Sequence, residues 1–186
     1  NEISVTSLDT TRAQLSQMRD KLANDMVNLE QLKTEKNVTK IATSQASKEL
    51  KNATRIELEK TTHVNQAQKI IAQYARYSYV ESRTLSGSAS DITRIAFGGP
   101  DTLADISREQ QTDANISNAD LEKALKTQEE AKRATQDREN AEKVYAESQR
   151  KENDFTVKIS QATVNIKTAK AALENGIDAY TTELMT

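Results

Sequence analysis

The chain has 186 residues, of which 35% are hydrophobic, 4% aromatic and 29% charged. This composition supplies too little apolar material for a thick core, and its scarcity of glycine and proline is typical of long helices. Lysine and arginine total 26 against 28 acidic residues, and the charges are interleaved. That pattern lacks the basic block of a protein that binds nucleic acid or an anionic membrane surface. No apolar run reaches the ~20 residues of a membrane-spanning helix.

The first half of the chain carries apolar residues at helical spacing. Leu8, Leu15, Leu22 and Leu29 recur every seven residues, and further apolar residues lie three or four positions from them. This heptad pattern predicts a long coiled-coil helix and argues against disorder, the competing explanation of such a polar composition. The pattern thins between 38 and 53. It then returns through Ile56, His63, Ile70 and Tyr77, with Ala67 and Tyr74 between them.

The residues that break helices are concentrated in the stretch ITRIAFGGPD, 92–101. It holds the only proline of the chain and two of its four glycines. We expect Gly87 and the serines around it to end the first helix, and a short helix to end at Gly98. Pro100 blocks continuation, and Asp101 caps the next helix.

The second half mirrors the first, with apolar residues, a polar middle and then a strong apolar stripe from Phe155 to Leu184. A strong-weak-strong profile that matches itself when folded back predicts an all-α antiparallel coiled-coil hairpin with a short helical tip. We expect a first long helix over 1–84, the tip over 85–101 and a second long helix over 102–186. The expected facing pairs are Leu29 with Phe155 and Ile159, Leu15 with Leu173, and Ile70 with Ile116. Two helices bury one stripe each, so we expect the hairpin to need a partner, a second copy or its tip for stability.

An apolar cluster at the tip is the candidate partner-binding site. Its members are Ile92, Ile95, Phe97, Leu103 and Ile106. Two interpretations stay open: the cluster packs against Tyr74, Tyr77 and Val80 to close the hairpin, or it forms a docking surface with an aromatic anchor.

Other residues suggest structure rather than chemistry. His63 falls on the apolar stripe that resumes at Ile56, so we interpret it as a histidine within the seam of the coiled coil. A metal site is not indicated, because no second histidine or cysteine accompanies it as a ligand. The polar middle, where Gln45, Lys48 and Asn52 are expected to face Arg138, Ala141 and Tyr145, reads either as register-setting polarity or as a docking groove. We predict no catalytic residue, metal or cofactor.

The stretch from Tyr74 to Gln111 resembles a known family. The succession YARYSYVESR, Leu-Ser-Gly-Ser and DITRIAFGGPDTLADISREQQ is similar to the N-terminal coiled coil of actinobacterial NlpC-type peptidoglycan endopeptidases of the RipA/RipC kind, to which the EnvC and PcsB coiled coils are analogous. In that family a small-residue turn, a short apolar helix and a Gly-Pro-Asp step occupy the tip. Here Gly87, residues 92–97 and residues 99–101 match them. The family's catalytic Cys-His domain has no counterpart in this chain.

The resemblance implies a regulatory, non-catalytic role at the cell wall. In the family the coiled coil binds the extracytoplasmic part of FtsX, within the FtsEX divisome complex, and restrains its own C-terminal catalytic domain. This chain is then expected to be a secreted or extracytoplasmic fragment, mature or excised because it begins with Asn1, that acts at the division septum, with a homodimer as a further option. The alternative is a structural rod or spacer: a surface-protein stalk, a sensor bundle or a phage assembly scaffold.

Overall fold

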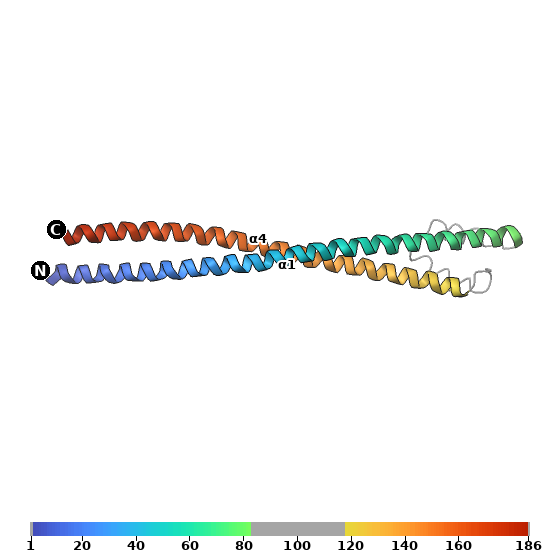
Figure 1. The fold of residues 1–186 in the computed structure, drawn as a ribbon, viewed down its shortest axis with the longest axis horizontal. Coiled ribbons are helices and arrows are strands. Elements are labelled where there is room, and N and C mark those ends of the chain that lie inside the picture. The colour runs from blue at the N-terminus through green and yellow to red at the C-terminus, as the bar shows by residue number, and fades with distance from the viewer. Residues whose placement is uncertain (1, 83–117, 186) are drawn as a thin grey trace. The chain divides into compact units, whose positions relative to one another are not determined.

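The structure, a computed structural model, describes residues 2–82 and 118–185, and the side-chain surroundings of 5–73 and 120–185. Two helices make up this part: α1, Glu2–Ser82, and α4, Asn118–Met185. They pack antiparallel as a helical hairpin (Figure 1). The predicted all-α hairpin is confirmed. The predicted tip, 85–101, and the first part of the predicted second helix, 102–117, lie outside the described residues.

Both helices are stabilised locally by short-range side-chain contacts. Neither contains proline, and Gly176 is the only glycine within them. Ion pairs one turn apart, such as Arg133 with Glu129 at 2.8 Å, support exposed helix faces. Many threonine hydroxyls donate to the backbone carbonyl four residues earlier, for example Thr54 to Leu50 at 2.8 Å. Because this bond satisfies the hydroxyl internally, threonine is tolerated on so many helical turns.

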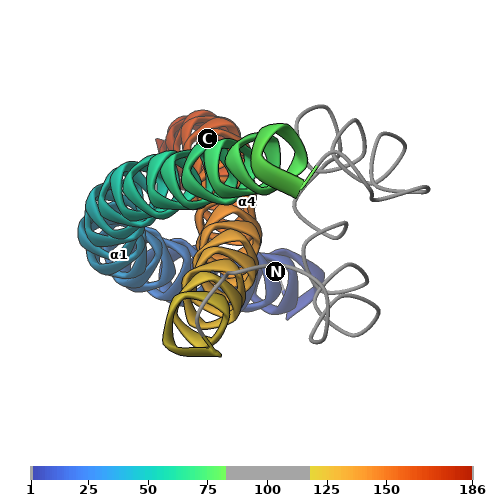
Figure 2. The same ribbon diagram turned by 90° about the vertical axis from the view of Figure 1, so that its right-hand side faces the viewer.

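The chain divides into two compact units. Unit 1 comprises 1–45 with 146–186, and unit 2 comprises 46–145. Each unit contains one segment of α1 and one of α4, and Figure 2, viewed along the helices, shows no third layer among the described residues. Each unit therefore has its core in a single seam between two helices.

The seam of unit 1 follows alternating steps of three and four residues. Its buried and half-buried positions on α1 and α4 are Leu8, Thr11, Leu15, Met18, Leu22, Asp25, Leu29, Leu32, Lys36, Thr39 and Thr43, and Ser148, Glu152, Phe155, Ile159, Ala162, Ile166, Ala169, Leu173, Gly176 and Tyr180. This is the spacing of a coiled-coil stripe. The predicted stripe is confirmed at the leucines from Leu8 to Leu29 and at the predicted positions from Phe155 to Leu173. Near its end it is wrong, because Ile177 and Leu184 are 47% and 57% exposed.

The same stepping occurs in unit 2, with different chemistry. On α1 the interior passes through Ala46, Leu50, Ala53, Glu57, Lys60, Val64, Ala67 and Ile71; on α4 it includes Ala124, Gln128, Ala131, Ala134, Arg138, Ala141 and Tyr145. Alanines and charged residues take the places that leucine and isoleucine hold in unit 1. Little apolar surface is therefore buried per turn in unit 2, and polar contacts have more influence there.

The apolar stripe predicted to resume at Ile56 differs in part from the observed seam of unit 2. Val64 is only 1% exposed and Ile71 4%, whereas Ile70 is 50% exposed and His63 is exposed. The interior of α1 keeps the phase set by Leu50 and Ala53, so the heptad series Ile56, His63 and Ile70 of the predicted stripe lies one residue off the seam, along its edge, whereas the predicted Ala67 is interior. His63 is thus an edge residue rather than a seam residue.

The facing pairs differ from those predicted. A methyl group added at Gly176 would meet Leu15 Cδ2 at 2.7 Å, and the Ser7 hydroxyl donates to Glu183 at 3.3 Å. The numbers in these pairs sum to 191 and 190. Leu15 therefore lies against a residue three positions beyond the predicted Leu173. The predicted partner of Ile70, Ile116, lies outside the described residues.

The difference in facing pairs also changes the predicted partner of Phe155. At sums of 190–191, Phe155 lies at the level of residues 35–36 of α1 instead of the predicted Leu29. The prediction matched apolar side chains alone and assumed a turn at the midpoint of the chain.

Candidate functional site

The predicted partner-binding cluster lies outside the described residues. This holds for all five of its members: Ile92, Ile95, Phe97, Leu103 and Ile106. Its two interpretations, a closed hairpin end or a docking surface, both remain predictions. Within the helices, the most distinctive polar feature is a set of charged side chains in unit 2, which we call the charged cluster: Glu57, Lys60, Glu130 and Arg138.

Arg138 is the centre of the charged cluster. It projects from α4, and its Nε donates to Glu57 on α1 at 2.8 Å; both side chains are about three-quarters covered, with 26% and 25% exposed. Its terminal nitrogens also pair with Glu142 at 2.6 Å and Glu139 at 3.7 Å on α4. The hydrogen bond to Glu57 raises the pKa of Arg138 above its ordinary value. Arg138 therefore joins the two helices as a permanent cation among three carboxylates.

Lys60 and Glu130 form the second link between the helices. Lys60 Nζ donates to Glu130 at 2.9 Å. The hydrogen bond and charge of Lys60 lower the pKa of Glu130, with a small contribution from His63. The carboxylate is consequently ionised at neutral pH, so Glu130 is unsuited to the role of a general acid.

The residues predicted to face each other in the polar middle of the hairpin differ from those that form the charged cluster. Gln45, Lys48 and Asn52, expected to face Arg138, are exposed. Arg138 instead reaches Glu57. Sequence reasoning missed Glu57 and Lys60 because it resumed the heptad pattern at Ile56, one residue out of phase with the seam. Continuing steps of four and three from Ala53 would have placed both charges in the seam.

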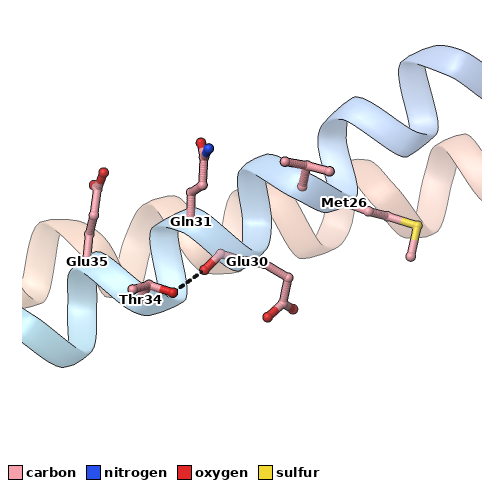
Figure 3. A pocket seen from close by; sticks show the side chains of 6 residues that line it. Met26, Glu30, Gln31, Thr34 and Glu35 are labelled. Atoms are coloured by element: carbon pink, nitrogen blue, oxygen red, sulfur yellow. Dashed lines mark hydrogen bonds between the residues drawn. The ribbon is translucent and has the colours of Figure 1, made fainter.

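A shallow, open hollow is found on unit 1. It is lined by Met26, Val27, Glu30, Gln31, Thr34 and Glu35. Figure 3 shows that all these side chains come from α1, with the Thr34 hydroxyl donating to the Glu30 carbonyl at 3.0 Å. Glu30 is also paired with Lys33 at 2.8 Å. A hollow on one helix lacks the convergent polar groups and enclosing walls of a small-molecule site.

The described helices contain no further grouping suited to chemistry. Within 5–73 and 120–185, no three His, Cys, Asp or Glu side chains are grouped so that they could hold a metal ion. No described helix has an apolar stretch of the length needed to cross a membrane. Every buried side-chain nitrogen or oxygen in this part of the chain has a hydrogen-bond partner. The polar groups of the described helices are thus used to join and support them.

Comparison of the chain with protein-family models, curated proteins and solved structures found no match.

Proposed function

We propose that this chain is a non-catalytic, partner-binding helical hairpin that regulates a cell-wall hydrolase. Its partners are the extracytoplasmic domain of an FtsX-like membrane protein and a peptidoglycan endopeptidase domain outside this chain. The proposal places it in the extracytoplasmic cell envelope, at the division septum. The observation that carries it is the hairpin itself: two helices of 81 and 68 residues pack antiparallel, and the segment between them in sequence contains the family-like motif.

The chemistry of the helices favours interaction over catalysis. The charged cluster pairs its charges across the seam, and the chain contains no cysteine. Nucleophilic hydrolysis requires an activated nucleophile beside a base. A hairpin can instead present a binding surface and carry a displacement along its helices, as in interface shifts of regulated assemblies.

The docking surface in this proposal is the apolar cluster of 92–106. Isoleucine and phenylalanine side chains each contribute about 1.5–3 kcal/mol when fully buried, so two of them inserted in a partner pocket suffice for a weak, specific contact. The cluster contains Phe97, one of only two phenylalanines in the chain. Aromatic anchors of this kind commonly dominate interface energies.

Calorimetry with the purified extracytoplasmic domain of the FtsX-like protein tests the proposal. The wild-type chain should bind, and Ile95→Asp or Phe97→Ala should weaken binding by at least tenfold. Ile41→Asp is the matched control, because Ile41 is 72% exposed on α1 and the same substitution there should leave the affinity unchanged. Melting curves by circular dichroism should be similar for all variants.

Three outcomes would contradict the proposal in different ways. Absence of binding by the wild-type chain would refute this partner and favour the structural rod. Equal weakening by Ile41→Asp and Ile95→Asp would show that the cluster is not the docking surface. A large fall in melting temperature for the Ile95 variant alone would assign the cluster to closing the hairpin.

A further inference from the structure

The apolar seam of unit 1 does not by itself specify one register, meaning one set of facing residues. Leu8, Leu15, Leu22 and Leu29 occupy the same heptad position, and all are buried or half-buried. The small residues Ala162, Ala169 and Gly176 also recur every seven positions on α4. Sliding one helix by a heptad therefore keeps a leucine opposite each of Ala162, Ala169 and Gly176. Identical repeats of this kind leave register weakly specified.

One apolar contact distinguishes the observed register from another. Leu29 opposite Phe155, a match of large side chains, corresponds to a sum of 184, seven less than the 191 of Leu15 and Gly176. In the structure Phe155 lies instead at the level of Lys36 or its neighbour. The observed register and the register that pairs Leu29 with Phe155 thus differ by one heptad.

The charged cluster of unit 2, in contrast, fits only one of these two registers. In the structure Arg138 meets Glu57, and Lys60 meets Glu130. A shift of one heptad in the direction that brings Phe155 to Leu29 would carry Arg138 to the level of Leu50. It would also bring Lys60 to Lys123. Half-buried charges would then lose their partners or face a like charge, which is unfavourable.

We propose that the hairpin has a second register, displaced by one heptad, and that the charged cluster is the latch that holds it in the observed one. Buried polar residues that fix the register of a coiled coil at some expense of stability are a well-attested device. The alternative register exchanges two ion pairs of unit 2 for the contact of Leu29 with Phe155 in unit 1, while the other leucine layers of unit 1 keep apolar partners except Leu32, which would lie at the level of Glu152. The two registers therefore compete through different parts of the same pair of helices.

This latch goes beyond the proposed function and does not depend on it. One heptad corresponds to about 10 Å of sliding, because each helical residue rises 1.5 Å. Discrete displacement of one helix past another is an established form of conformational switching. A ligand that binds one register better than the other shifts the population toward it, whatever the identity of that ligand.

Disulfide formation can report both registers within unit 2. The sums of 190 and 195 for the two ion pairs place Leu50 at the level of 140–145, hence of Ala141. In the shifted register Leu50 lies at the level of Ala134. The variants Leu50→Cys/Ala141→Cys and Leu50→Cys/Ala134→Cys therefore distinguish the registers, since a disulfide tolerates only about 4 Å between Cβ atoms. The chain has no cysteine of its own to interfere.

The double substitution Lys60→Glu/Arg138→Glu, which we call the reversed latch, reverses the charge of both cations in the charged cluster. This change repels both observed partners, and it offers Lys123 an opposite charge at position 60 in the shifted register. The full-length chain with an intact latch should form only the Ala141 crosslink. With the reversed latch, the Ala134 crosslink should become at least as abundant. Adding Glu57→Arg/Glu130→Lys restores both pairs and should return the crosslink to Ala141.

The matched control is Lys51→Glu/Arg133→Glu, the same charge change at exposed positions of unit 2; it should leave the crosslinks unchanged. If the reversed latch lowers helicity, Arg138→Met provides the second variant, because it removes the charge and keeps much of the volume. A detectable Ala134 crosslink is expected there too. Exclusive Ala141 crosslinking in the helical reversed variant, or in Arg138→Met, would overturn the proposal. So would failure of the restored pairs to recover the Ala141 crosslink.

Discussion

Gly176 shows how a single residue adapts the seam to its partner. Within a helix, glycine costs about 1 kcal/mol relative to alanine. Here the missing side chain leaves room for Leu15, whose Cδ2 would lie 2.7 Å from an added methyl group. The absence of a side chain at Gly176 thus makes space for the Leu15 side chain, in the way that side chains of one helix pack between residues of the other in a coiled coil.

Gly176→Ala should have an effect that depends on Leu15. In the wild-type chain, the gain in helix propensity is offset because the half-buried Leu15 side chain must rotate away, so the free energy of unfolding should change by less than about 0.5 kcal/mol. In a Leu15→Ala background the same substitution should stabilise by about 1 kcal/mol. Urea unfolding of the four proteins measures this coupling. Equal effects in both backgrounds would show that the two residues do not interact.

Glu130 gives the hairpin a dependence on acidity. Its pKa is lowered from an ordinary value of 4.5, chiefly by the hydrogen bond from Lys60. Because the folded-state pKa lies below the unfolded-state value, the unfolded chain binds more protons in the window between them. Glu130 therefore contributes stability above about pH 4.5, and that contribution is lost as the pH falls through the folded-state pKa.

Glu130→Gln should accordingly have a larger effect at pH 7 than at pH 3. The melting temperature of the variant should lie below that of the wild type at pH 7, and the two should converge in acid. Circular-dichroism melts at the two pH values provide the measurement. Glu122→Gln, an exposed carboxylate on the same helix, is the control. A difference between wild type and Glu130→Gln that grows on acidification would contradict the assigned sign.

At the scale of elements, the phase of α1 decides which side chains support unit 2. Val64 is in the interior at 1% exposure, and His63, its neighbour in sequence, is exposed. Successive residues of a helix point about 100° apart, so a stripe displaced by one residue lies along the edge of the seam. The apolar series of Ile56 and Ile70 follows that edge and widens the apolar face of the helix beyond a narrow seam.

Alanine substitution at these neighbouring positions tests the phase. Val64→Ala should destabilise the chain by about 1–3 kcal/mol, because it removes fully buried methyl groups and leaves a cavity. His63→Ala should change stability by no more than about 0.5 kcal/mol, since an exposed side chain makes few contacts. Chemical denaturation of both variants is the measurement. The reverse order would restore His63 to the seam.

At the scale of the whole molecule, the proposed role gives the described helices the tasks of binding and support. The single histidine of the sequence is exposed on α1, and the acidic residues of the charged cluster are held by cations. The proposed role assigns hydrolysis to a domain outside this chain. Regulation would then depend on partner binding and on the register of the helices.

On the proposed role, the purified chain should release no soluble fragments from peptidoglycan, because its sequence contains no cysteine to act as the nucleophile of the Cys-His chemistry. Dye release from labelled sacculi, with an authentic peptidoglycan endopeptidase as the positive control, measures this. Turnover that persists after removal of contaminating hydrolases, and that copurifies with the chain, would contradict the assignment of hydrolysis to another domain.

The sequence by itself determined that the chain forms two long antiparallel helices. Three local signals indicate this fold: leucines seven residues apart, interleaved charges, and the concentration of glycine and proline at 92–101. Each can be recognised in a short stretch of sequence without knowledge of the rest of the fold. The interior leucines from Leu8 to Leu29 and the interior positions from Phe155 to Leu173 followed from the same periodicity.

Only the tertiary structure decided which residues face each other. A heptad repeat looks the same after a shift of seven residues, so the leucines of α1 cannot distinguish Gly176 from Ala169 as a partner. In the proposed latch, the choice of register depends on Glu57, Lys60, Glu130 and Arg138. These charges form their ion pairs only when the opposing helix is in place. Periodicity is a property of one helix, whereas register is a property of two.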